Sequence, residues 1–279
     1  MASVTLDLDA YLERIGYRGP VQPTRGVLDE LHLGHVTKIP FENLDILLGR
    51  PIRLDLESLQ RKLVQGRRGG YCFEHNTLFA AALEAIGFGV TRLAARVRFG
   101  TRGVTARTHM TLRVEADGEE WLADVGFGAG SIFRSMPIEP GRDVDQFGWR
   151  FRLVEDGENR VLRARRPTGW ADLYAFTFEP QHAVDYELAN HYTSTHPSSP
   201  FTRTLTAQLS APERSLILRG RKLIEETPLG QSVSEVGEEE LLGVLAERFT
   251  LVFPPGTRFD AVPAVPSVPP VSRAITPDA

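Results

Sequence analysis

The chain has 279 residues, of which 42% are hydrophobic and 24% are charged, and its formal net charge is −4. This composition is typical of a soluble globular protein, and the mild acidic balance argues against nucleic acid or an anionic membrane as a partner. The single cysteine excludes an intrachain disulfide framework and a multi-cysteine metal site. Because the start lacks the segments of a signal peptide and no apolar run approaches the roughly 20 residues of a membrane span, we expect a cytoplasmic protein with a reduced thiol.

Helices are predicted for about the first 90 residues. Asp7 and Thr24 are placed to cap two of them, and each is followed by apolar residues at helical spacing, namely Leu8, Tyr11, Leu12 and Ile15 in the first and Val27, Leu28 and Leu31 in the second. A third helix is predicted over residues 55–66, with Gly66 as its stop. A fourth begins near Cys72 and is apolar on nearly every side, so we expect it to be the buried helix of a bundle.

From about residue 90 the apolar period changes from 3.6 to 2. Residues 90–99, 107–115 and 120–127 alternate in this way, and Asp117-Gly118 is a hairpin signal between the last two segments. Three more segments of this kind follow, at residues 149–154, 160–166 and 171–178. We therefore expect an antiparallel sheet or barrel up to about residue 180.

The rest of the chain mixes both periods. Residues 185–196 favour a helix, and residues 202–209 and 214–226 favour strands. Residues 234–249 place four apolar side chains on one helical face, namely Leu241, Leu242, Leu245 and Phe249. From Pro254 onward the sequence is dense in proline and valine without a period, and we expect an extended or disordered tail.

The only cysteine lies in the segment RRGGYCFEHN, residues 67–76. Cys72 stands where a loop passes into the fourth predicted helix, and a helix N-terminus favours the thiolate form through its free N–H groups and its dipole. Gly69 and Gly70 allow positive φ and the close approach of a substrate. Arg67 and Arg68 would add to this field if they pointed inward, but we expect these loop residues to be solvated. Because a lone cysteine is often simply a small buried hydrophobe, both roles stay open here.

A nucleophilic cysteine needs a base, and the base needs an orienting acceptor. His75 is one turn after Cys72, and His109 interrupts a predicted strand. Other histidines fit simpler roles: His32 and His35 form a weak metal pattern, and His191 and His196 flank a polar stretch. Asp124 closes a strand just before a glycine-rich loop, where a carboxylate has poor sheet propensity. The pattern alone does not choose among the seven histidines.

The glycine-rich loop GFGAG, residues 126–130, is a weak nucleotide motif. It lacks the lysine-serine ending of a phosphate-binding loop and the GxGxxG spacing of a dinucleotide site. We interpret it as a loop whose bare backbone approaches a ligand beside Asp124.

Several motifs together resemble one family, the arylamine N-acetyltransferases. They are RGGYCFEHN, a following strand with His109-Met110, the segment WLADVGFG, and the upstream IPFENLD of residues 39–45. Their order and spacing agree over roughly residues 5–250, and the Pro-rich tail is outside the resemblance. The resemblance implies an α+β fold with a cysteine-protease-like Cys-His-Asp core. Its parts would be a helical bundle (residues 1–90), an antiparallel β-barrel (91–185), an α/β lid (186–253) and the tail (254–279).

The resemblance also implies a catalytic triad, which falls on Cys72, His109 and Asp124, and it selects His109 over His75. The implied reaction is ping-pong acyl transfer. Acetyl-CoA loads an acetyl group on Cys72, and an arylamine or arylhydrazine then removes it. Acetyl-CoA is a substrate here, so we expect no permanently bound cofactor and no metal. The expected partners are small molecules, and the chain is expected to be a monomer or a homodimer.

By the same resemblance, a substrate pocket would involve Phe41, Val97, Thr108, Gly126, Phe127, Gly128 and Phe201. Phe127 and Phe201 would offer flat apolar surface to an aromatic ring. Residues 126–130 would lie by the CoA pyrophosphate, and because the loop has no positive charge, binding there would depend on backbone N–H groups.

Three other functions share part of this pattern. An amide synthase of the same family would keep the triad but release a polyketide acyl chain as a macrolactam, which needs a wider cleft. A papain- or transglutaminase-like hydrolase would pass the acyl group to water. A non-catalytic binding protein with the same fold would be expected to have lost a triad residue, and Cys72, His109 and Asp124 are all present.

Overall fold

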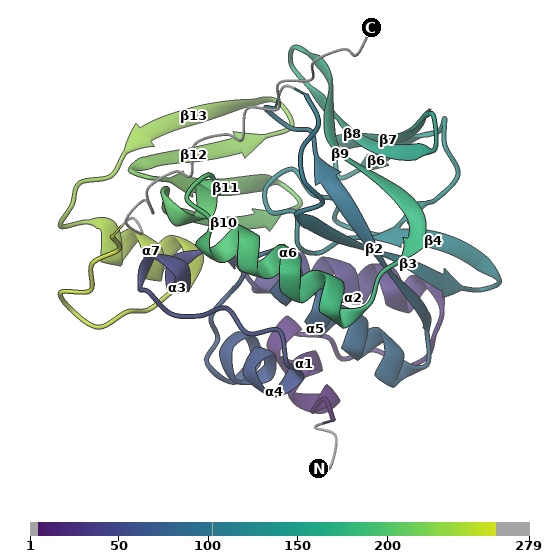
Figure 1. Cartoon of the computed structure of the whole chain (residues 1–279), viewed down its shortest axis with the longest axis horizontal. Coiled ribbons are helices and arrows are strands. Elements are labelled where there is room, and N and C mark those ends of the chain that lie inside the picture. Colours follow the sequence, from purple (N-terminus) through teal and green to yellow (C-terminus); the bar gives the residue numbers. More distant parts are fainter. Residues whose placement is uncertain (1–4, 102, 261–279) are drawn as a thin grey trace, which may run out of the picture.

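The computed structural model describes residues 5–101 and 103–260 (Figure 1). Its first part is helical, with α1 (Leu8–Ile15), α2 (Arg25–Lys38), α3 (Leu44–Leu47), α4 (Leu56–Leu59), η1 (Gln60–Gln65) and α5 (Cys72–Ile86), and one short strand, β1 (Phe41–Glu42). The predicted caps are confirmed, because Asp7 accepts from Ala10 N and Thr24 accepts from Val27 N. In the described ranges, no helix is long and apolar enough to cross a membrane.

The third predicted helix is confirmed, but its second half has an unexpected geometry. Asp55 caps α4 through Ser58 N, and the chain then widens into η1, a π-helix whose C-cap is Gly66. A π-helix is rare and is found most often at functional sites. It leads directly into the loop that carries Cys72.

The middle of the chain forms an eight-stranded antiparallel sheet in the order β5-β4-β3-β2-β9-β8-β7-β6, which curls into a nearly closed barrel. Its strands are β2 (Gly89–Val97), β3 (His109–Ala116), β4 (Glu119–Ala123), β5 (Met136–Pro137), β6 (Asp143–Gln146), β7 (Trp149–Asp156), β8 (Asn159–Arg166) and β9 (Gly169–Pro180). The predicted hairpin is confirmed, since Asp117 and Gly118 both have positive φ between β3 and β4. The barrel expected from the alternating pattern is therefore present.

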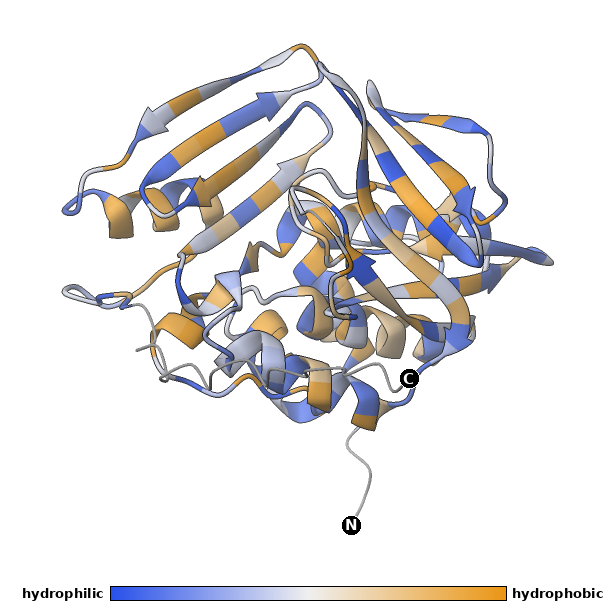
Figure 2. Cartoon of the chain, turned by 45° about the horizontal axis from the view of Figure 1, so that its top comes forward, coloured by the Kyte–Doolittle hydropathy of each residue, from blue (hydrophilic) through white to orange (hydrophobic). Residues whose placement is uncertain are grey.

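The last part combines two helices with a second sheet. Its elements are α6 (Ala183–Thr195), the 3-10 helix η2 (Pro200–Thr202), β10 (Thr206–Ala211), β11 (Arg214–Arg219), β12 (Lys222–Thr227), β13 (Gly230–Glu235) and α7 (Leu241–Phe249). The sheet has the order β1-β10-β11-β12-β13, so the early strand β1 forms its edge. In Figure 2, strands of both sheets alternate between hydrophilic and hydrophobic residues, as expected for sheets with one buried face.

Two apolar clusters hold these parts together. The larger one is continuous from the N-terminal helices into the barrel and includes Cys72 and its neighbours on α5. The smaller one joins α3 to the second sheet and α7, for example through Leu44, Leu218 and Phe249. Helix α5 is consequently the buried helix that the sequence predicted. The division at residues 90, 185 and 253 stays a prediction.

The predicted tail lies mostly outside the described residues, which end at Asp260. Residues 254–260 contain no helix or strand, and Asp260 N donates to Leu47 O at 3.3 Å. This bond connects the end of the described chain to α3.

Candidate active site

Cys72 is the first residue of α5, as predicted. The carboxylate of Glu74 accepts a hydrogen bond from Tyr71 N at 3.0 Å, which fixes the start of the helix. The Cys72 side chain is 4% exposed, and its thiol donates to the carbonyl oxygen of Thr108 at 3.5 Å. The thiol therefore faces the residue that precedes β3, with the free N–H groups of the first turn of α5 beside it.

His109 begins β3 and contacts Asp124, which follows β4. The two side chains are buried, and His109 Nε2 lies 2.7 Å from Asp124 Oδ2. Burial alone lowers the pKa of His109, but the Asp124 charge and its hydrogen bond, helped by Cys72, raise this pKa to about 10. Burial likewise raises the pKa of Asp124, and His109, Asn76 and Gly126 together bring it below its usual value. With Nε2 held by Asp124, Nδ1 is the nitrogen of His109 left for the thiol proton.

Asp124 is held by two residues that the sequence analysis did not assign to the site. Asn76, one turn after Cys72 on α5, donates to Asp124 Oδ1 at 2.9 Å and to Met110 O at 2.7 Å. His32 on α2 accepts from Asp124 N at 3.1 Å through Nε2, so its Nδ1–H donates to Phe133 O. Burial lowers the pKa of His32 to about 4, as this accepting role requires. Helix α2 thus holds the backbone of Asp124, and helix α5 holds its carboxylate.

The glycines near Cys72 are required for a different reason from the one predicted. Neither Gly69 nor Gly70 has positive φ. A Cβ on Gly69 would overlap the carbonyl oxygen of Pro40, and one on Gly70 would lie 2.6 Å from Glu74 Oε2. They let the loop pack closely against the protein itself. Gly126 brings the glycine-rich loop to the nucleophile, because a Cβ there would lie 2.8 Å from Cys72 Cα.

Aromatic rings surround the His109 side chain. Phe127 and Tyr174 lie with ring centroids 5.2 Å and 4.7 Å from its imidazole. Tyr174, from β9, was not predicted, although its position in an alternating apolar segment is visible in the sequence. Phe41 and Phe201 form a second aromatic pair, with centroids 5.9 Å apart. The two pairs come from four different segments of the chain.

The remaining predicted pocket residues are less uniform in position. The carbonyl oxygen of Thr108 accepts a hydrogen bond from the Cys72 thiol. Gly128 packs against Phe41, and its φ of 86° is in the left-handed region. Val97 ends β2, and its register partner on the neighbouring strand β9 is Tyr174, whose ring contacts His109. The structure brings Thr108 to the nucleophile, places Gly128 beside Phe41 and Gln208, and gives Val97 only this indirect link.

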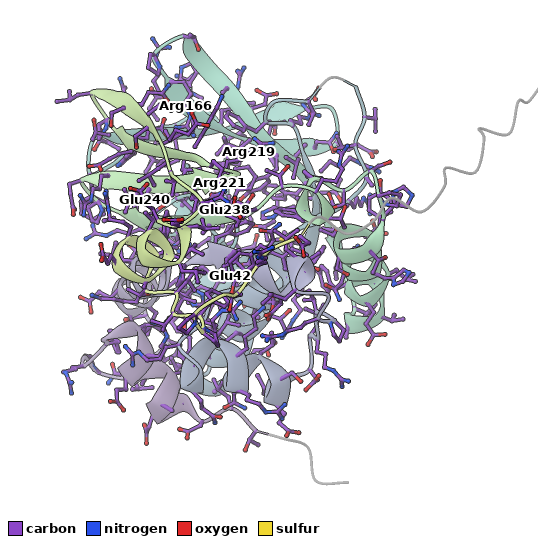
Figure 3. All side chains as sticks on the ribbon, turned by 90° about the vertical axis from the view of Figure 1, so that its left-hand side faces the viewer. Glu42, Arg166, Arg219, Arg221, Glu238 and Glu240 are labelled. Carbon is purple, nitrogen blue, oxygen red and sulfur yellow. The ribbon has the colours of Figure 1, made fainter. Side chains whose placement is uncertain are left out.

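The glycine-rich loop has fewer free N–H groups than expected. Gly126 N donates to Asp124 Oδ1, and Ala129 N donates to Gln208 Oε1. The structure supplies a positive charge that the loop itself lacks, because the guanidinium of Arg166 lies against Gly130 where a Cβ would otherwise be. Arg166, which is labelled in Figure 3 and comes from β8, also pairs with Glu226 of β12 at 2.7 Å. It therefore connects the barrel, the loop and the second sheet.

His75, the other candidate base, is engaged elsewhere. Its Nε2 lies 3.0 Å from Gly70 O, so this nitrogen carries the proton, and Nδ1 accepts from His35 Nε2 at 2.8 Å. His35 Nδ1 in turn accepts from the Tyr11 hydroxyl at 2.9 Å. Both nitrogens of His75 are used in this buried chain, and neither is left for Cys72. In the described ranges, no group of three His, Cys, Asp or Glu residues could hold a metal ion.

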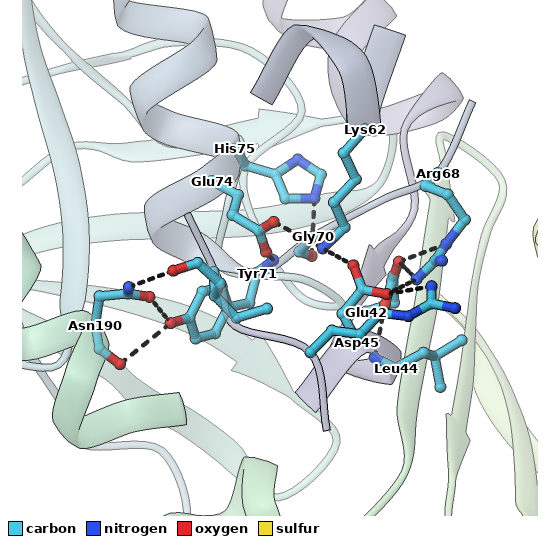
Figure 4. A network of polar contacts seen from close by, with 12 residues as sticks. Glu42, Leu44, Asp45, Lys62, Arg68, Gly70, Tyr71, Glu74, His75 and Asn190 are labelled. Carbon is cyan, nitrogen blue, oxygen red and sulfur yellow. Dashed lines mark hydrogen bonds and ion pairs between the residues drawn. The ribbon is translucent and has the colours of Figure 1, made fainter. Parts of the chain in front are cut away.

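A buried ionic network supports the loop before Cys72 (Figure 4). Arg68 Nε donates to Glu42 Oε1 at 3.0 Å, and Lys62 pairs with both Glu74 at 2.7 Å and Asp45 at 2.9 Å. The expectation that Arg68 is solvated was wrong, because its side chain is only 14% exposed and is paired with Glu42. Its charge is neutralised within the network rather than directed at the thiol.

Comparisons with known proteins identify the family of the chain. An N-acetyltransferase family model matches residues 26–256. The arylamine N-acetyltransferase of Mycolicibacterium smegmatis is 37% identical over 253 residues, covering 88% of this chain and 92% of the relative. The solved structure of the Nocardia farcinica arylamine N-acetyltransferase has a TM-score of 0.86 and 45% identity, covering 89% of this chain and 90% of its own.

One solved structure of similar fold contains a ligand. It is the Mycobacterium marinum arylamine N-acetyltransferase in complex with CoA, with a TM-score of 0.84 and 36% identity, covering 88% of this chain and 92% of its own. The matches extend over most of each chain and reach well above the identity at which only a fold is shared. The resemblance predicted from the sequence is confirmed: the chain belongs to the arylamine N-acetyltransferase family of acyltransferases.

Proposed function

We propose that the chain transfers an acetyl group from acetyl-CoA to arylamines and arylhydrazines through an acetyl-cysteine at Cys72. The observation that carries this proposal is the buried His109–Asp124 pair beside a thiol at the start of α5. A nucleophile, a base and an orienting carboxylate are the three groups that acyl transfer by a thiol needs. They come from a helix and from two strand ends, so the folded chain holds their geometry.

In the first half-reaction, the proton of the Cys72 thiol resides on His109 Nδ1 as a thiolate–imidazolium pair, the state that the raised pKa of His109 favours, while Asp124 holds the opposite nitrogen. The thiolate sulfur attacks the thioester carbonyl, and N–H groups of the first turn of α5 stabilise the oxyanion, at about 10²–10³-fold for one such donor. The C–S bond to CoA breaks, and the CoA thiolate takes the proton from His109. The acetyl group then remains on Cys72 as a thioester.

In the second half-reaction, the amine nitrogen attacks the acetyl carbon of the same thioester. His109 takes a proton from the attacking nitrogen and returns it to the sulfur as the bond to Cys72 breaks. The products are the N-acetylated amine and the free thiol. The aromatic rings of Phe127, Phe41 and Phe201 provide apolar surface for the ring of the acceptor.

Intact-mass measurement tests the first half-reaction directly. Incubation with acetyl-CoA alone should add one acetyl group to the protein, and Cys72→Ala should add none. Adding 4-aminobenzoate or an arylhydrazine should remove the group and yield the acetylated amine. An absent adduct on the wild type, or an equal adduct on Cys72→Ala, would refute the mechanism. Loading by a long-chain acyl thioester but not by acetyl-CoA would instead support the amide synthase, and rapid loss of the adduct in water would support a hydrolase.

We also propose that Arg166 contributes to binding the phosphates of acetyl-CoA, since it places a cation against the glycine-rich loop. Arg166→Gln should raise KM for acetyl-CoA about tenfold, the size of one charge-assisted hydrogen bond, with kcat little changed. A donor without phosphates, such as 4-nitrophenyl acetate, provides the matched control and should react equally with both proteins. An equal loss with both donors would mean that Arg166 acts only on the fold.

A further inference from the structure

A second cavity lies apart from the triad, between the N-terminal helices and the end of α7. Its volume is about 630 Å³, and four of its lining residues are basic, namely Arg14, Lys38, Arg67 and Arg68. None of the residues that line it is acidic, and none belongs to the triad. A cavity of this size is within the range of sites for small molecules, and its lining favours an anion.

The four basic side chains differ in whether a carboxylate of the protein pairs with them. Arg68 is paired with Glu42 and Asp45. For Lys38 and Arg67, no ion pair is found within residues 5–101 and 103–260, and both residues are exposed. Two positive charges therefore stand at the cavity without a compensating carboxylate in the described chain.

Arg14 adds to the positive field because it is buried without a carboxylate. Its guanidinium donates to backbone oxygens, including Leu63 O at 2.9 Å and Lys38 O at 2.6 Å. Burial, and then the nearby Arg67, lower the pKa of Arg14 to about 10. Carbonyl groups at the ends of α2 and η1 stabilise the cation, but they carry no net charge to cancel it.

The backbone around the cavity is also unusual. Arg67 has a φ of 49° and Thr250 a φ of 59°, both in the left-handed region, and both residues line the cavity. This conformation costs a residue with a Cβ roughly 1–2 kcal/mol. The π-helix η1 ends at Gln65, two residues before Arg67. Thr250 is the C-cap of α7, where this conformation is common, so Arg67 is the departure that bears on a ligand.

We propose that this cavity is a binding site for a small organic polyphosphate, with the phosphates at Lys38 and Arg67. Leu209 and Val252 line the cavity as well and give apolar surface for the organic part of the ligand. The inference is independent of acetyl transfer, because neither Cys72 nor the glycine-rich loop takes part.

Calorimetric titration with ADP, pyrophosphate and uncharged adenosine tests the site. We expect ADP and pyrophosphate to bind saturably and adenosine not to bind. Lys38→Glu and Arg67→Glu should each raise the Kd for ADP at least about tenfold, which corresponds to the loss of one charge-assisted contact. Arg142→Glu is the matched control, because Arg142 is exposed on the barrel, away from the cavity, and undergoes the same change of charge. It should leave ADP binding unchanged.

A further variant separates this cavity from the acetyl-CoA site, since ADP is also part of that donor. ADP binding that survives Arg166→Gln but is lost in Lys38→Glu supports the cavity. Binding lost in Arg166→Gln and kept in Lys38→Glu would overturn it, as would equal binding of adenosine or no binding of pyrophosphate at millimolar concentration. Thermal melting of each variant verifies folding, and both substituted residues are exposed, so the folded state should persist.

Discussion

Four buried histidines in the two halves of the site differ in charge: His109 is protonated, and His32, His35 and His75 are neutral. On the barrel, His109 has a pKa raised to about 10. On the helices, burial lowers the pKa of His32 and of His75 to about 4 and puts that of His35 well below its usual value. The exposed fractions of all four are 2% or less. Burial alone therefore does not decide the charge.

The difference lies in the partner that each ring meets. His109 faces a carboxylate, whose attraction exceeds the cost of burying the charge. The helical histidines face carbonyl oxygens, N–H groups and one another, and a second proton on His35 or His75 would remove an acceptor from the chain that begins at Tyr11. The pair with Asp124 keeps His109 protonated. The hydrogen-bonded chain Tyr11–His35–His75, here called the neutral frame, stays uncharged and bonds to Gly70 in the loop before Cys72.

Removal of the carboxylate should have the largest effect. In Asp124→Asn the shape and one oxygen persist, but the charge that stabilises protonated His109 is lost. We expect kcat/KM for acetyl transfer to fall by about 10³–10⁴, as for comparable substitutions in other triads. Steady-state rates measure this, with circular dichroism to verify the fold. A loss below tenfold would show that the charge of Asp124 is dispensable.

Interruption of the neutral frame should affect stability more than chemistry. His35→Phe leaves the Tyr11 hydroxyl and His75 Nδ1 buried without partners, and each such group costs about 1–3 kcal/mol. We expect the free energy of unfolding to fall by about 2–4 kcal/mol, measured by urea denaturation. Full stability in this variant would refute the hydrogen-bond chain.

The pH dependence of stability distinguishes the two kinds of histidine. Because the folded pKa of His75, about 4, is below the unfolded value of about 6.5, the unfolded chain binds the proton more tightly between these pH values. The stability that His75 confers over His75→Gln should therefore be full above pH 6.5 and fall by about 1.4 kcal/mol per pH unit toward pH 4. Unfolding curves of both proteins at several pH values measure this difference.

His109 should show the opposite dependence. Its folded pKa is raised, so the stability from the His109–Asp124 pair is present below pH 6.5 and is lost as pH rises toward 10. The difference between the wild type and Asp124→Asn should shrink over that window. A difference that grows with pH would contradict the assignment.

The smallest expected effect is that of Tyr11→Phe, which removes one hydroxyl from the end of the chain. It leaves His35 Nδ1 unpaired, and we expect a loss of about 1 kcal/mol. In the double variant Tyr11→Phe/His35→Phe, the loss of unfolding free energy should be less than the sum of the two single losses. The reason is that the Tyr11 hydroxyl, which His35→Phe alone leaves buried without a partner, is then absent. Strict additivity would indicate that the two side chains do not interact.

Local sequence was sufficient for most elements. Asp7 and Thr24 predict helix starts because their side chains bond within the next turn, and Asp117-Gly118 predicts a hairpin because its φ angles suit that turn. The start of α5 near Cys72 was predicted because a glycine-containing loop there passes into an apolar helical segment. The π-helix η1 was missed, since its residues have the composition of an ordinary helix.

The site depended on contacts that local patterns do not encode. Pattern alone left His75 and His109 as rival bases, and only the resemblance to a family chose between them. In the folded chain, His75 is committed to Gly70 and His35, and His109 meets Asp124. The glycines before Cys72 were identified, but their reason was not, because it lies in the approach of Pro40 and Glu74.

The sequence by itself determined where most of the longer helices and strands form and that one cysteine begins a buried helix, because those features depend on neighbours a few residues apart. The tertiary structure decided which histidine is charged, that Asn76 and His32 hold Asp124, and that Arg166 reaches the glycine-rich loop. Each of these depends on groups from elements distant in the chain. Burial and partner charge arise only when those elements pack, and together they set the chemistry of the same side chain.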